Sequence, residues 1–126
     1  MQALNDQIDW ERLKDAYTHA GRLLERMGMH KALKGFVYLS WAAALAYENE
    51  ARLYAVGEEL YRPVARHFGT TPQAVERLIR HAVESTMDAS EARGVYGLFG
   101  NTLDPARGKP TNAQLIALLV QRMRVA

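Results

Sequence analysis

Cysteine is absent from this sequence, and the residues that interrupt regular structure are few. Without a thiol the chain has no disulfide, no cysteine nucleophile, no zinc finger and no iron–sulfur cluster. Four prolines and nine glycines in 126 residues exclude a collagen-like or low-complexity chain. Because 48% of the residues are apolar, a chain of this length can bury its own core. We therefore expect residues 1–126 to form one compact domain.

Long apolar segments are absent as well. The longest apolar run, from Trp41 to Tyr47, is much shorter than the ~20 residues that cross a bilayer as a helix. The first 17 residues hold charges where a signal peptide needs a continuous apolar core. These two absences predict a soluble, cytoplasmic protein without a membrane partner.

The net charge is only +2, but it is distributed unevenly along the chain. Residues 1–60 contain seven Lys/Arg and nine Asp/Glu, whereas residues 61–126 contain nine and five. Four arginines but only one acidic residue, Glu76, fall within residues 61–80. A basic half beside a mildly acidic half suits an anionic partner, although small proteins also show such asymmetry by chance.

Apolar residues recur every three or four positions along nearly the whole chain, which is typical of amphipathic helices. No segment shows the alternation and β-branched enrichment of a strand. Gly28 is placed to end the first helix, and residues 103–110 are placed in a loop by their two prolines and one glycine. The sequence therefore predicts an all-α domain of about six helices. The expected helical segments are 9–27, 33–47, 50–60, 61–68, 72–88, 90–98 and 112–125.

Residues 61–88 have the spacing of a helix-turn-helix, in which two helices cross closely and are joined by a tight turn. Ala65 is the small residue at the crossing, and Gly69, four positions later, can adopt the positive φ of such a turn. We expect the helix to break at 69–71. The side chains expected to face inward are Val64 and Phe68 from the first helix and Val75, Leu78, Ile79, Ala82, Val83 and Thr86 from the second.

Two threonines can cap the second helix of this unit. Thr70 or Thr71 can accept a backbone N–H, and Thr70 can also form a capping box with Gln73. Pro72 suits the first turn, where no N–H is needed. The sequence leaves the choice between the two threonines open.

The exposed side of the second helix carries side chains that can read base edges. In a major groove arginine pairs with guanine, glutamine pairs with adenine, and glutamate accepts a hydrogen bond from cytosine. We predict base contacts to double-stranded DNA from Gln73, Glu76, Arg77 and Arg80. Two helices with a glycine turn also occur in ordinary bundles, where the same residues would form a solvated face.

Three separated motifs resemble one family and together cover about three-quarters of the chain, from Leu33 to Val125. The motifs are LKGFVYL, then TTPQAVERLIRHAVE, then LFGNT followed by GKPTNAQLIALL. They are similar to the C-terminal effector domain of the stage-zero sporulation master regulator of endospore-forming bacteria. The resemblance implies a six-helix transcription factor domain that binds short promoter boxes, often in tandem. It also implies contact with an RNA polymerase sigma factor and a homodimer on tandem boxes.

The resemblance carries over to individual positions of the second helix. The residues that match the family's recognition helix are Glu76, Arg77, Arg80 and His81. Gln73 and Ala74 stand where the family has Ser and Arg, so we expect the docking mode to be kept and the base preference to differ. Lys109 matches a family lysine, and the last helix can be capped by Thr111 or Asn112. The predicted phosphate contacts are Thr70, Thr71, His81, Lys109 and Thr111.

The family's α/β receiver domain has no counterpart in this sequence. The acidic residues nearest the N-terminus lie in helical or pre-helical sequence and not at the end of a strand: Asp6, Asp9 and Asp15. We expect either one domain of a longer protein or a receiver-less homologue, in which phosphorylation would not be the switch. Two function classes therefore stay open. One is a sequence-specific DNA-binding regulator, and the other is a protein-interaction module that modulates a full-length regulator or a sigma factor.

Catalytic and metal-binding patterns are weak. No two histidines have the spacing of a helical zinc site, and no serine stands in a nucleophile elbow. The histidines concerned are His19, His30, His67 and His81. We expect no cofactor, no metal and no enzyme activity.

Overall fold

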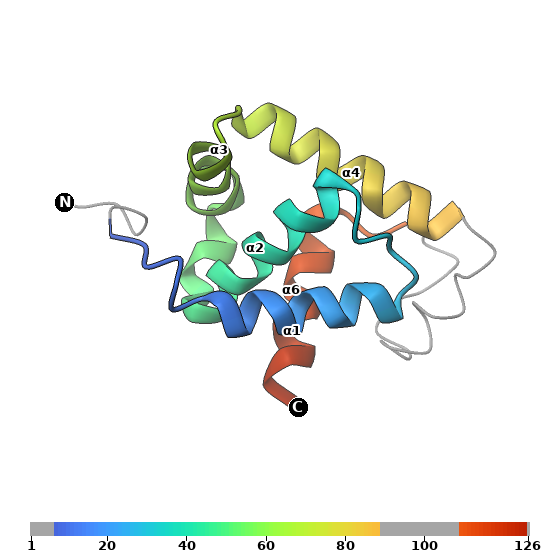
Figure 1. Ribbon diagram of the computed structural model, residues 1–126, viewed down its shortest axis with the longest axis horizontal. Coiled ribbons are helices and arrows are strands. Elements are labelled where there is room, and N and C mark those ends of the chain that lie inside the picture. Colours follow the sequence, from blue (N-terminus) through green and yellow to red (C-terminus); the bar gives the residue numbers. More distant parts are fainter. Residues whose placement is uncertain (1–6, 89–108, 126) are drawn as a thin grey trace.

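A computed structural model describes residues 7–88 and 109–125 of the chain. Every regular element in these two ranges is a helix, and they pack into one unit (Figure 1). The elements in chain order are α1 (Lys14–Arg26), α2 (Lys34–Glu48), the 3₁₀ helix η1 (Glu50–Tyr54), the π-helical turn η2 (Gly57–Tyr61), α3 (Arg62–Phe68), α4 (Pro72–Asp88) and α6 (Asn112–Val125). The predicted all-α fold class is confirmed.

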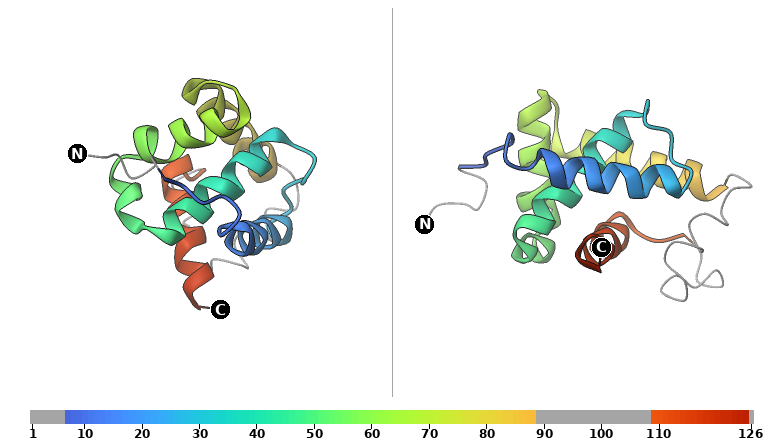
Figure 2. Two further views of the ribbon diagram at one scale, coloured as in Figure 1. Left: turned by 60° about the vertical axis from the view of Figure 1, so that its left-hand side comes forward. Right: turned by 60° about the horizontal axis from the view of Figure 1, so that its bottom comes forward.

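Helix α2 forms the centre of the domain, with α1, α4 and α6 packed around it (Figure 2). From Gly35 to Ala46 its side chains are buried, except for the half-buried Val37. A helix that is apolar on all sides is stable only when other helices cover it. The alanines in its second half have no exposed surface, which lets the neighbouring helices approach closely: Ala42, Ala43, Ala44 and Ala46.

Helix α4 crosses α2 at a glycine. A Cβ built on Gly35 would collide with the carbonyl oxygen of Leu78 and lie 2.7 Å from the Cβ of Ala82. No other residue type fits this crossing without a shift of the α4 backbone. Sequence spacing identified Ala65 as the small residue of the unit, and Ala65 is indeed buried. The spacing did not single out Gly35.

Most predicted helix boundaries agree with the structure, and two do not. The predicted helix 9–27 starts only at Lys14, because the residues before it form i→i+3 turns in which Asp9 accepts the N–H of Arg12 at 3.2 Å. The predicted helix 50–60 is wrong as one element. The Asn49 side chain accepts the N–H of Ala51 at 3.0 Å, and Ala55 leaves the helical region with φ −146° and ψ 63°, so η1 ends before the continuous helical stretch that leads through η2 into α3. The predicted helix 90–98 lies outside the described residues.

The two described residues with positive φ are both glycines that end helices. Gly28, predicted to end the first helix, has a φ of 98°, and the next N–H bonds back to Leu24 at 3.0 Å. Gly69 ends α3 in the same way. Glycine tolerates this left-handed conformation because it has no Cβ.

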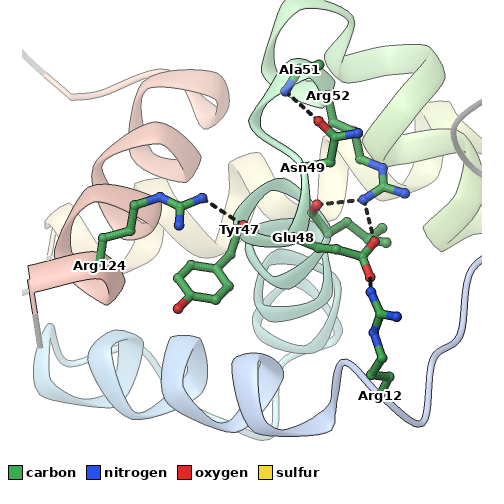
Figure 3. A network of polar contacts seen from close by, with 8 residues as sticks. Arg12, Tyr47, Glu48, Asn49, Ala51, Arg52 and Arg124 are labelled. Carbon is green, nitrogen blue, oxygen red and sulfur yellow. Dashed lines mark hydrogen bonds and ion pairs between the residues drawn. The ribbon is translucent and has the colours of Figure 1, made fainter.

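Three arginines from different elements hold the C-terminal end of α2 (Figure 3). Arg52 is only 3% exposed, and it donates to the Leu45 carbonyl at 2.7 Å and to Glu48 at 2.9 Å. Arg12 binds the other oxygen of Glu48 at 3.0 Å. The last carbonyls of a helix lack partners within the helix and favour cations. Arg52 adds a second donor to the Leu45 carbonyl, which also accepts the N–H of Asn49, whereas Arg12 binds only the Glu48 carboxylate.

Arg124, near the end of α6, completes this set. Its guanidinium donates to the Tyr47 carbonyl at 2.7 Å, pairs with Glu50 at 3.0 Å and lies over the Tyr47 ring at 4.6 Å from the centroid. We call Arg12, Arg52 and Arg124 the arginine network. The network attaches three parts of the chain to the C-terminal end of the central helix α2. These parts are the segment that precedes α1, the 3₁₀ helix η1, and α6.

Aromatic rings connect α3 with the segment that precedes α1. The Trp10 ring stacks on His67 with centroids 4.0 Å apart, and its edge meets Trp41 at 5.2 Å. Tyr17 in turn stacks on Trp41 at 4.3 Å. The ring of His67, a residue of α3, is thus in direct contact with the segment that precedes α1.

Candidate nucleic-acid interface

The turn between α3 and α4 has the predicted geometry. Gly69 lies in the left-handed region, with φ 68° and ψ 38°. The N–H of Thr70 donates to the Ala65 carbonyl at 2.9 Å, the long bond that closes a helix ending in a left-handed residue. The predicted break at 69–71 is confirmed, and α3 and α4 form a helix-turn-helix.

Thr71, not Thr70, caps α4. Its hydroxyl oxygen accepts the N–H of Ala74 at 3.1 Å, and Pro72 is the first residue of the helix. A side-chain cap of this kind contributes about 1 kcal/mol to helix stability. This contact holds the turn against the start of α4 and uses the Thr71 hydroxyl oxygen as an acceptor, so its O–H can still donate.

The inner face of α4 agrees with the prediction. Val75 and Ile79 have no exposed surface, and Leu78 is half-buried at the edge of this face. The remaining predicted inner residues are also buried: Ala82, Val83 and Thr86. Val64 of α3 is buried as predicted, but Phe68 is 41% exposed. The prediction that Phe68 faces inward is therefore wrong. Phe68 is the last residue of α3 and lies past the contact between α3 and α4. Its ring centroid is 5.3 Å from that of Tyr38.

The outer face of α4 carries the predicted base-reading residues. Gln73, Arg77, Arg80 and His81 are exposed, and Glu76 is half-buried. The Arg80 Nε–H donates to both carboxylate oxygens of Glu76 at 3.2 Å. Within the described part of the chain, Arg77 has no ion-pair or hydrogen-bond partner. Two of the four predicted base contacts thus bind each other, while the guanidinium of Arg77 is left open to solvent.

Lys109, which lies just before α6 in the sequence, is next to the end of α4 in the structure. Its ammonium lies 2.6 Å from Asp88, the last residue of α4, and this hydrogen bond raises the pKa of Lys109 above its ordinary value. Lys109 is exposed. A surface ion pair of this type is worth little in water and exchanges readily with other anions. The lysine is thus held beside the end of α4 without being buried there.

Thr111 caps α6 through a reciprocal capping box. Its hydroxyl accepts the N–H of Gln114 at 3.1 Å, while the Gln114 side chain accepts the N–H of Thr111 at 2.9 Å. The structure thus selects Thr111 over Asn112 as the cap. An open pocket of about 480 Å³ separates this helix start from α4, and it is bordered by Arg80, Lys109 and Thr111. Of the nine predicted contacts, four therefore border one depression, namely Glu76, Arg80, Lys109 and Thr111, and the other five do not line it.

Asn112 and Tyr61 belong to this site and were not predicted for it. The Asn112 Nδ2–H donates to the Glu76 carbonyl at 3.1 Å. Burial raises the pKa of Tyr61, hydrogen bonding with Asn112 lowers it, and the charge of Glu76 raises it again. These contacts join residues far apart in sequence, so periodicity and spacing contain no signal for them. The only local signal was the position of Asn112 directly after Thr111, the cap of α6.

A tight left-handed turn, a capped second helix and arginines on its outer face define a helix-turn-helix DNA-binding domain. A scan against family models matches residues 21–123 to the family described as "Sporulation initiation factor Spo0A C terminal". Because the match covers most of the chain, the protein belongs to this family, and the resemblance found from the motifs is confirmed. The family is the DNA-binding effector domain of a sporulation regulator; it binds double-stranded DNA and is not an enzyme family.

In residues 7–88 and 109–125 no cluster of three or more His, Asp or Glu side chains has an arrangement that could hold a metal ion. The helices in the same ranges are all too short or too polar to cross a membrane.

Proposed function

We propose that this protein is a sequence-specific transcriptional regulator that reads a short box in the promoters of sporulation-type genes. The observation that carries the proposal is Arg77, an exposed arginine on the outer face of α4 that has no partner within residues 7–88 and 109–125. A guanidinium in this position can bond guanine O6 and N7 at once, the commonest specific contact in the major groove.

The first half of α4 would enter the major groove, with Gln73 nearest the turn and Arg77 one helical turn further on. Glu76 and Arg80 pair at the surface, where an exposed ion pair is worth at most about 1 kcal/mol. Exchanging that pair for base contacts therefore costs little. Gln73 would pair with adenine, and Glu76 would accept from a cytosine amino group.

Phosphate contacts would flank this helix on both sides. We assign them to Thr70, Thr71, His81, Lys109 and Thr111. Lys109 would transfer its ammonium from Asp88 to a phosphate, which releases condensed counterions and makes binding salt-dependent. Contacts of this type set the orientation of the protein and carry no sequence information.

The box should differ from that of a relative with an arginine at position 74. Ala74 is half-buried, and its N–H is bound by the Thr71 cap, so this position presents no cation to DNA. The same residue favours the second candidate function, a protein-interaction module that modulates a full-length regulator or a sigma factor. We place the protein in the cytoplasm at the nucleoid, with a sigma factor and a second copy on tandem boxes as further partners.

Selection of bound duplexes from a random library tests the proposal. We expect one short motif to be enriched, with a guanine at the position read by Arg77. Repeating the selection with Arg77→Ala should remove the preference at that base and leave the rest of the motif. A selection that enriches no motif would favour the protein-interaction module.

A further inference from the structure

Asn112 is the first residue of α6 and is only 9% exposed. Its amide donates to the Glu76 carbonyl at 3.1 Å, across 36 residues of sequence. This carbonyl belongs to the first half of α4, directly before Arg77. We propose that Asn112 is a positioning residue that keeps the phosphate-binding loop 109–111 in register with the DNA-reading half of α4. The inference rests on the proposed function.

Asn112 has the contacts that such a role requires. Tyr61 of η2 and Glu76 of α4 line the same pocket as Asn112, so this amide lies where three separate elements meet. A buried amide that loses its partner is costly, which keeps these contacts formed. Directly before Asn112, the capping box of Thr111 and Gln114 fixes the backbone of the loop relative to α6. The position of Lys109 is thereby tied to that of α6.

The start of α6 is attached to α4 at two points with different roles. Near the end of α4, Lys109 binds Asp88 at 2.6 Å, and near the beginning, Asn112 binds Glu76. The first contact is exposed and involves the lysine that would move to a phosphate. When Lys109 leaves Asp88, the buried Asn112 bond stays and keeps the loop near α4. Without that bond, ordering the loop on DNA would cost conformational entropy and reduce the contribution of Lys109.

The test is a comparison of Lys109→Ala in two backgrounds, the parent protein and Asn112→Ala. Affinity is measured for the selected box and for a random duplex at several salt concentrations. In the parent, Lys109→Ala should weaken binding roughly five- to tenfold at about 0.1 M salt and lower the salt slope by about one charge. Asn112→Ala should by itself give nearly the same loss and the same lower slope. Adding Lys109→Ala to it should change affinity less than about twofold.

Two controls separate positioning from a general loss of stability. Asn49→Ala removes one asparagine hydrogen bond far from α4 and should leave the full Lys109→Ala effect. Arg77→Ala should weaken binding to the box by the same factor in the parent and in Asn112→Ala. If Asn112→Ala melts below the assay temperature, Asn112→Ser supports the same measurement, because its shorter side chain does not reach the Glu76 carbonyl.

The outcomes are distinct for the two proposals. A parent protein that binds no DNA overturns the proposed function. A parent that binds DNA, with an undiminished Lys109→Ala effect in Asn112→Ala, overturns the positioning role alone. A Lys109→Ala variant that binds like the parent overturns that role as well.

Discussion

The arginine network at the end of α2 and the arginines on α4 use the same side chain in opposite ways. Arg52 is buried and donates to a carbonyl and a carboxylate inside the domain. Arg77 is exposed and has no partner among the described residues. The arginines of the network hold the fold together, whereas Arg77 is available to a ligand. Whether an arginine has a partner inside the domain therefore indicates its role, structural or ligand-binding, better than its charge or exposure alone.

The difference has a local cause. The network surrounds a helix C-terminus, where free carbonyls and the helix dipole attract cations. Arg77 lies in the middle of α4, where the backbone groups are bonded to each other. Its neighbour Arg80 shows an intermediate case, because Glu76 is one turn away and binds it at the surface.

The largest expected effect concerns the orientation of α4, which decides that Arg77 faces outward. Val75 has no exposed surface, so Val75→Asp would bury a charge without a partner. We expect a loss of about 4 kcal/mol in the free energy of unfolding, measured by urea denaturation. A variant as stable as the parent would mean that the inner and outer faces of α4 are exchanged.

The next effect distinguishes the two arginine groups by stability. Arg52→Met removes the bonds to Leu45 and Glu48 and should cost about 3 kcal/mol. Arg77→Met, the matched control, should change stability by less than about 0.5 kcal/mol. Equal losses in thermal and urea unfolding would remove the contrast between the groups. The folded fraction of Arg52→Met should bind DNA like the parent.

The same arginines should separate in the opposite sense by DNA binding. Arg77→Ala should cost about 1–3 kcal/mol on the selected box and much less on random DNA. Fluorescence anisotropy on both duplexes measures the two losses. Were the loss the same on both, Arg77 would be a phosphate contact, and base reading would fall to Gln73 or Arg80.

The smallest effect concerns Lys109, a cation that the fold holds only weakly. Lys109→Ala should weaken binding to the box and to random DNA by similar factors and lower the salt slope by about one charge. Titrations at two or more salt concentrations give the slope. Asp88→Asn is the useful counterpart, because it frees Lys109 from its ion pair and should strengthen binding slightly. A loss confined to the box would instead indicate a base contact.

Local sequence was enough to predict the helix-turn-helix. The boundaries of α4 and the left-handed Gly69 follow from interactions within a few residues, which spacing and residue type encode directly. The inner face of α4 was also predicted from local spacing. For the neighbouring helix α3, the prediction that Phe68 faces inward was wrong. The segment 50–60 was harder, because a local cap at Asn49 competes with a continuous helix.

By itself, the sequence determined the all-α class, the turn, the outward arginines and the family, because each depends on short-range patterns or on matching motifs. Only the tertiary structure decided that Gly35 meets α4, that Lys109 lies beside Asp88 and that Asn112 binds the Glu76 backbone. These contacts join residues between 21 and 47 positions apart. Their geometry depends on how whole helices pack, and no periodicity along the chain records it.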